Sequence, residues 1–92
     1  MSDANTIVLE GVVDISRAES LYGEFEKSIS NGGNITMKSK GLDRIDTSII
    51  QVILAAKQSV EEHHSEMIWQ PPSEAMKNTT RLLGVDEILG LQ

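Results

Sequence analysis

Short apolar runs alternate with segments of helical spacing along this chain, and this alternation restricts the fold more than any other feature. Residues 6–10 are β-branched and aliphatic, and apolar and polar side chains alternate over residues 34–40, so both segments are predicted to be strands. Residues 66–70 form a third apolar run, which Pro71 ends because proline offers no amide hydrogen to a strand ladder. Strands separated by helices indicate parallel crossover connections, so we expect an α/β fold with helices packed on a sheet.

Three helices are predicted between and after these strands. Ser16 followed by Glu19 has the spacing of a capping box, and Gly32 is expected to end the helix that starts there. That helix carries apolar side chains at helical intervals: Ala18, Leu21, Tyr22, Phe25 and Ile29. A second helix covers residues 48–62, and Ser73 is expected to cap the third.

Two connecting segments complete this outline. Residues 41–46 are expected to form a loop. Three strands are few for an isolated sheet, so residues 11–14 either add a short extra strand or leave an edge that a partner covers. The chain of 92 residues shows no linker or internal repeat, which predicts one domain over residues 1–92.

Composition excludes several classes of function. The chain has no cysteine, which removes disulfides, thiol nucleophiles and thiolate metal sites. Its 14 acidic and 8 basic residues give a formal charge of −6, which repels nucleic acid and anionic lipid but leaves a basic protein partner open. Residues 1–6 lack the basic stretch and apolar run of a secretory signal, so a cytoplasmic location without direct membrane insertion is expected.

The helix predicted over residues 48–62 has two distinct sides. At about 3.6 residues per turn, one side gathers apolar side chains that are expected to face the sheet: Ile49, Ile53, Ala56 and Val60. Smaller side chains follow the margin of that stripe, and we call them the small-residue track: Ser48, Val52, Ala55 and Ser59. The track is either a tolerated surface or a docking surface on which a partner's backbone approaches closely.

Polar side chains at the start of this helix admit two interpretations. Asp46, Thr47 and Ser48 can each accept hydrogen bonds from the free amides of a first helical turn, and capping alone would explain them. In this capping interpretation, Asp43 and Asp46 stabilise the local backbone and interact favourably with the helix dipole. In the other interpretation these residues form a rim of the docking surface, and the residues alone leave both open.

Three patterns in order along the chain resemble the STAS family of anti-sigma-factor antagonists and related small domains. Residues 9–18 read LEGVVDISRA, residues 42–48 read LDRIDTS and precede an apolar helix, and residues 82–85 read LLGV. The resemblance covers nearly all of the chain. It implies that residues 1–92 form a single STAS domain, with a small sheet of mostly parallel strands packed with helices.

The resemblance implies a non-enzymatic function in protein binding. Family members commonly carry a phosphorylated serine in an Asp-Ser-Ser-Gly or Asp-Thr-Ser-Gly element, and that position falls on Ser48, with Thr47 as the runner-up. The implied partners are an anti-sigma factor or a GHKL-type serine kinase and a phosphatase, without a cofactor. The expected partner-binding residues are Asp43, Asp46, Thr47, Ser48, Val52, Ala55 and Ser59.

Two departures keep a second function open. Ile49 stands where the family usually has glycine, and the segment ahead of Leu9 is shorter than in many antagonists. The short segment is similar to the STAS subunit of bacterial lipid-asymmetry ABC transporters and to STAS proteins associated with chemotaxis. In the transporter alternative, the expected partner-binding residues dock constitutively on an ATPase.

The densest set of potential metal ligands follows the predicted second helix: Glu61, Glu62, His63, His64 and Glu66. Adjacent residues at a helix end point in different directions, so we expect a solvated helix end and no metal site.

Gly32-Gly33 lacks the later glycines and the Lys-Ser/Thr pair of a nucleotide-binding loop, and is expected to be a helix cap.

Overall fold

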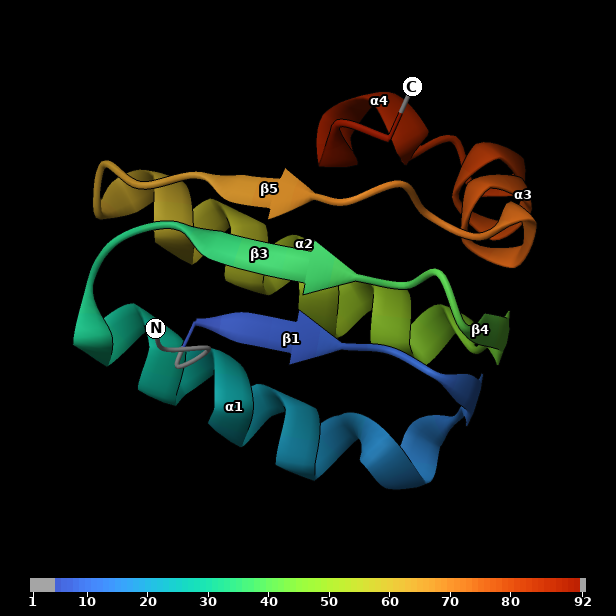
Figure 1. Cartoon of the computed structure of the whole chain (residues 1–92), viewed down its shortest axis with the longest axis horizontal. Helices are drawn as coiled ribbons and strands as arrows, with labels where there is room; N and C mark the ends of the chain where they lie inside the picture. The colour runs from blue at the N-terminus through green and yellow to red at the C-terminus, as the bar shows by residue number, and fades with distance from the viewer. Residues whose placement is uncertain (1–4, 92) are drawn as a thin grey trace.

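The computed structural model describes residues 5–91, in which strands and helices alternate along the chain (Figure 1). The strands are β1 (Thr6–Val8), β2 (Gly11–Val13), β3 (Ile35–Lys38), β4 (Leu42–Ile45) and β5 (Met67–Trp69). The helices are the short 3-10 helix η1 (Ile15–Arg17) and the α-helices α1 (Ala18–Asn31), α2 (Thr47–Glu62), α3 (Glu74–Leu82) and α4 (Asp86–Leu89). Residues 1–4, part of the segment expected to lack a secretory signal, lie outside this description. Over residues 5–91 no helix combines the length and the apolar character that a membrane span requires.

The strands form two small parallel sheets. One has the order β1-β3-β5, and the other pairs β2 with β4. The predicted α/β class and the parallel pairing are therefore confirmed. Residues 11–14 supply the extra strand β2, which was one of the two alternatives for that segment.

The prediction of a loop over residues 41–46 is wrong, because Leu42–Ile45 forms strand β4. Leu42 and Ile45 are buried, whereas Asp43 and Arg44 between them are exposed, so the burial pattern lacks the alternation by which a strand is recognised. The register also shifts between Gly11 and Val12, where β2 pairs with β4. An irregular strand of this kind is stabilised by its partner strand more than by its own sequence pattern.

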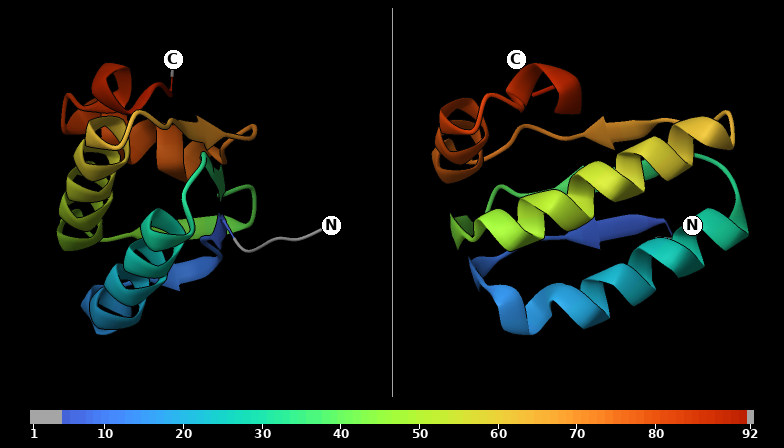
Figure 2. Two further views of the ribbon diagram at one scale, coloured as in Figure 1. Left: turned by 90° about the vertical axis from the view of Figure 1, so that its left-hand side faces the viewer. Right: turned by 180° about the vertical axis from the view of Figure 1, so that it is seen from behind.

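The elements are arranged in layers (Figure 2). Helices α1 and α2 lie side by side on one face of the β1-β3-β5 sheet, and no helix of residues 5–91 lies over the opposite face of β1 and β3. Helix α3 packs against β4, and α4 follows it above β5. Within residues 5–91, one face of the main sheet thus has no helix packed on it.

A largely aliphatic core lies between the sheet and the helices. Ile7, Ile35 and Met37 point into it from the strands and are at most 2% exposed. The stripe predicted on the second helix is confirmed, since these side chains of α2 are all buried: Ile49, Ile53, Ala56 and Val60. Full burial of one such aliphatic side chain stabilises the fold by about 1.5–3 kcal/mol.

The first helix starts in a different way from the predicted capping box. Ser16 lies inside η1, and its amide and hydroxyl both donate hydrogen bonds to Oδ1 of Asp14. Helix α1 begins at Ala18, after Arg17, whose side chain makes no capping hydrogen bond. The capping box of Ser16 and Glu19 is therefore wrong, because Asp14 caps the turn two residues earlier.

The helix boundaries predicted at Gly32 and Ser73 are confirmed. Gly32 ends α1 with a φ of 79°, and Gly33 follows with a φ of 85°, a region that side chains with a Cβ rarely adopt. Oγ of Ser73 accepts a hydrogen bond of 3.2 Å from the amide of Met76 at the start of α3. Both boundaries depend on local backbone chemistry, which a sequence displays directly.

Candidate functional site

The start of α2 is fixed by the neighbouring strand. The amide of Asp46 donates to the carbonyl of Val13 at 3.1 Å, and the amide of Ile49 donates to the carbonyl of Asp46 at 3.0 Å. Asp46 occupies the N-cap position with an extended backbone, but its side chain makes no capping hydrogen bond. Strand pairing of the backbone therefore sets this helix start in place of a side-chain cap.

The hydroxyls at the helix start are not engaged. Within residues 5–91 neither Thr47 nor Ser48 makes a side-chain hydrogen bond. Thr47 is exposed and Ser48 is half-buried, while Ile49 beside them is fully buried. No side-chain hydrogen bond thus supports the capping interpretation, and the Ser48 hydroxyl borders solvent.

Carboxylates gather beside this helix start. Val13 and Ile45 are register partners in the β2-β4 sheet, so Asp14 and Asp46, which follow them, leave adjacent strands at the same end. The Ser16 hydroxyl and amide donate to the Asp14 carboxylate, and these bonds hold its pKa below the ordinary value of 3.8. Asp14 is consequently ionised at neutral pH and contributes negative charge at this end of the sheet.

The predicted small-residue track forms part of a cavity. Val52, Ala55 and Ser59 line one wall of a space of about 370 Å³ between α1 and α2, together with Ala56. Ser48 and the rim residues Asp43, Asp46 and Thr47 are not in this lining. The structure therefore brings three of the track residues together and places the hydroxyls of Thr47 and Ser48 one helical turn away, at the start of the same helix.

The opposite wall of this cavity was not identified from the sequence. It is supplied by α1, chiefly through Tyr22, Phe25 and Ile29, with Glu26 as a charged residue of the lining. Tyr22 was counted among the apolar positions of the first helix, yet it is 57% exposed. An aromatic side chain at the edge of an amphipathic stripe was the available signal, because a tyrosine combines an apolar ring with a polar tip.

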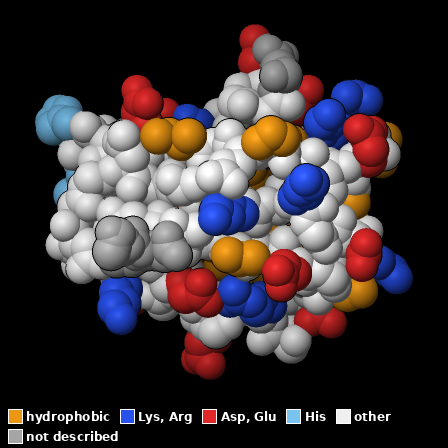
Figure 3. Space-filling view, in the orientation of Figure 1, with side chains coloured by type: hydrophobic (Ala, Val, Ile, Leu, Met, Phe, Trp, Pro, Cys, Tyr) orange, Lys and Arg blue, Asp and Glu red, His pale blue; other side chains and the backbone are white. Residues whose placement is uncertain are grey.

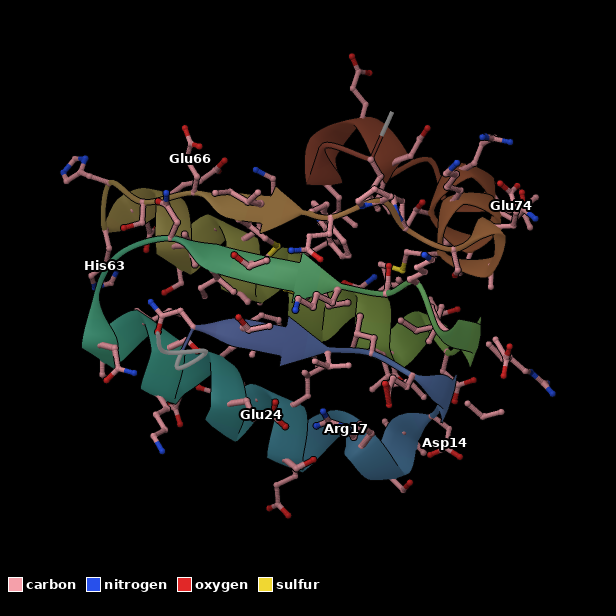
Figure 4. All side chains as sticks on the ribbon, viewed as in Figure 1. Asp14, Arg17, Glu24, His63, Glu66 and Glu74 are labelled. Atoms are coloured by element: carbon pink, nitrogen blue, oxygen red, sulfur yellow. The ribbon has the colours of Figure 1, made fainter. Side chains whose placement is uncertain are left out.

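The histidines of the second helix end are far from this site. Figure 4 shows His63 and Glu66 at the opposite end of the molecule from Asp14. Nδ1 of His63 lies 2.8 Å from the carbonyl of Ser59, and both histidines are exposed. Residues 5–91 contain no group of three or more His, Cys, Asp or Glu side chains placed to hold a metal ion.

Two solved structures share this arrangement of strands and helices. The unphosphorylated form of the anti-sigma factor antagonist SpoIIAA aligns with a TM-score of 0.69 and 21% identity, over 98% of this chain and 94% of that one. A crystal structure of Mglu aligns with a TM-score of 0.64 and 16% identity, over 75% of this chain. The aligned part is only 17% of the Mglu chain, so that likeness concerns one portion of a larger protein.

Sequence comparisons identify a family for this chain but no individual curated relative. No curated protein sequence matches the chain. A family model described as "Mlab, STAS domain" matches residues 1–91, which is nearly the whole chain. The parallel α/β fold agrees with this match, which shows that the chain belongs to the STAS domain family.

Proposed function

We propose that this chain is a non-enzymatic, cytoplasmic protein-interaction switch in which phosphate on Ser48 weakens the binding of a regulatory partner. The partner is an anti-sigma factor or a GHKL-type serine kinase, and a phosphatase restores the binding form. One observation carries the proposal: the Ser48 hydroxyl is unengaged within residues 5–91 and stands at the start of the helix that carries the track. The likeness to the unphosphorylated form of SpoIIAA supports it.

The docking surface of this proposal combines the helix start with the cavity between α1 and α2. Ala55 is exposed, and Val52 and Ser59 are half-buried, so a partner's backbone can approach α2 closely. Tyr22 stands on the opposite wall and offers a large, rigid contact area. Asp43 and Asp46 extend the surface beyond the helix start and favour a partner with basic side chains.

Phosphorylation acts on this surface through charge. A phosphate adds about −1.5 to −2 charges at neutral pH, beside a helix start that already has Asp14 and Asp46 near it. The positive end of the α2 dipole compensates part of that charge, which protects the fold. The net effect is a strongly anionic rim on the docking surface without refolding of the domain.

A second candidate function is a constitutive subunit that docks on the ATPase of a lipid transporter. Burial of Ile49 favours it, because this side chain anchors the residue after Ser48 in the core. The hydrogen bond from its amide to Asp46 restrains the same segment, whereas a glycine there would let it bend toward a kinase. The chemotaxis-associated STAS proteins form a third group of relatives, and in each case the same face would contact the partner.

Copurification tests the proposed function and separates it from the alternative. The tagged chain is expressed in its own host, and the proteins retained with it are identified by mass spectrometry. A GHKL-type kinase or a phosphatase among them supports the switch, and an ABC ATPase held equally by wild type and Ser48→Asp supports the constitutive subunit. Incubation with the retained kinase is expected to modify Ser48, and modification only at other sites would contradict the switch.

A further inference from the structure

A cavity of about 370 Å³ lies where the three strands of the main sheet end. Val8 and Glu10 border it at the end of β1, residues 38–41 at the end of β3, and Gln70 at the end of β5. The three strands are parallel, so their carboxyl ends meet at one edge of the sheet. Open parallel sheets bind small ligands at this edge, where loops from several strands converge.

Two lysines without partners give this cavity a local positive charge. Lys38 is half-buried and Lys40 is exposed, and neither makes an ion pair or a side-chain hydrogen bond within residues 5–91. Figure 3 shows basic side chains standing over the middle of the open sheet face, on a chain whose formal charge is −6.

A buried hydroxyl lies in the same lining. Ser39 is fully buried between these lysines, and its Oγ has no hydrogen-bond partner within residues 5–91. Its carbonyl accepts hydrogen bonds from the amides of Leu42 and Ser73, which holds the turn after β3 in place. Side chains alternate along a strand, and Met37 two residues earlier points into the core, so the enclosed Ser39 hydroxyl lies on the core side. The turn that Ser39 anchors therefore places Lys38 and Lys40 on the side of the cavity.

The carboxylate of Glu10 limits the ligand further. Glu10 also lines the cavity and makes no ion pair within the described chain. A simple anion would place like charges together at Glu10, whereas a ligand hydroxyl would donate a hydrogen bond to this carboxylate. The ligand must therefore carry an anionic group for the lysines and a hydroxyl donor for Glu10.

We propose that this cavity binds a small, soluble phosphomonoester that carries hydroxyl groups. Its phosphate lies between Lys38 and Lys40, and one of its hydroxyls donates to Glu10. The cavity volume falls in the lower part of the range of about 300–1,000 Å³ that small-molecule sites occupy.

The test is an amide NMR titration of the folded chain with ribose 5-phosphate, with ribose and inorganic phosphate as comparisons. Saturable shifts are expected at the residues that end β1, β3 and β5, and ribose 5-phosphate is expected to bind more tightly than either comparison. The double variant Lys38→Gln/Lys40→Gln is expected to raise the Kd at least about tenfold, because it removes both charge-assisted contacts. Glu10→Gln is expected to reduce the preference for ribose 5-phosphate over inorganic phosphate.

A matched control comes from a second cationic cavity of the chain. Lys77 and Arg81 line a space next to Trp69 and Asp86, so Lys77→Gln/Arg81→Gln removes the same charge elsewhere. This variant is expected to leave the Kd unchanged, and circular dichroism confirms that each variant is folded. The proposal is overturned by the absence of saturable shifts, by an equal loss in the control variant, or by binding only to vesicles that contain phosphatidic acid.

Discussion

The two binding regions of this domain differ in charge and in the elements that form them. Between α1 and α2, the cavity is mostly apolar and Glu26 is the charged residue of its lining. At the carboxyl ends of β1, β3 and β5, a cavity of equal volume carries Lys38 and Lys40. An apolar groove bordered by acidic residues suits a protein partner, and a cationic cavity suits a small anion. The proposals accordingly assign different classes of ligand to separate surfaces of one small domain.

Helix α2 is expected to have one face that packs in the core and another that contacts a partner. The substitution Ile53→Glu tests the core face. Ile53 is fully buried, so the substitution places a carboxylate in the core without a counter-charge. The free energy of unfolding is expected to fall by more than about 4 kcal/mol, measured by urea denaturation and circular dichroism. Ile53→Val is the matched control and is expected to lose only about 0.5–1.5 kcal/mol. A folded Ile53→Glu domain would contradict this division of α2.

Phosphorylation of Ser48 is expected to have the next largest effect and to act on the helix side alone. Phosphate should raise the Kd for the copurified partner by about 10- to 100-fold through like-charge repulsion. Ser48→Asp is expected to give a smaller increase, and Ser48→Ala should bind normally and resist modification. Affinities are compared by calorimetry at one salt concentration. Tight binding by the phosphorylated form would remove the switch and favour the constitutive subunit.

The small-residue track of α2 is expected to contact the partner directly. Val52→Glu adds a carboxylate to the cavity between α1 and α2, and a roughly tenfold rise in the Kd is expected. Gln58→Glu adds the same charge on an exposed part of α2 and is the matched control. Both variants are expected to keep the wild-type unfolding transition to within about 1 kcal/mol. Equal affinity of Val52→Glu and wild type would place the interface elsewhere.

Features set by residues close in sequence were predictable in this chain. The stripe of α2 repeats at helical spacing and is buried as expected, and Gly32 and Ser73 mark boundaries by their own chemistry. Ser48 is found one residue inside α2, which begins at Thr47 instead of Ser48. These signals depend on neighbouring residues, which a sequence displays directly.

Features set by contacts between distant segments could not be predicted. Strand β4 was missed because Asp43 and Arg44 interrupt its apolar pattern, and its pairing with β2 supplies the order that its sequence lacks. The cavity at the carboxyl ends of β1, β3 and β5 is lined by Glu10, residues 38–41 and Gln70, which are far apart along the chain. Each residue alone is typical of a polar surface, and only the parallel sheet brings their side chains to one edge.

The smallest expected effect concerns the acidic residues near the start of α2 and depends on pH. Hydrogen bonds from Ser16 lower the pKa of Asp14 below 3.8 in the folded chain. A carboxyl whose pKa is lowered by folding stabilises the folded state above its unfolded pKa, and this stabilisation is lost as the pH falls through the folded pKa. Wild-type stability should therefore decline below about pH 4, partly through protonation of Asp14.

Asp14→Asn tests that contribution, because an asparagine oxygen still accepts from the Ser16 amide but does not titrate. At neutral pH the variant is expected to be slightly less stable than wild type, since its hydrogen bonds lack the charge. Urea denaturation between pH 7 and about pH 2.5 is expected to show a shallower loss of stability in the variant than in wild type below pH 4. Asp43→Asn is the control, because the Asp43 carboxylate makes no hydrogen bond within residues 5–91. Parallel pH profiles for wild type and Asp14→Asn would show that Asp14 contributes no pH-dependent stability to the helix side of the molecule.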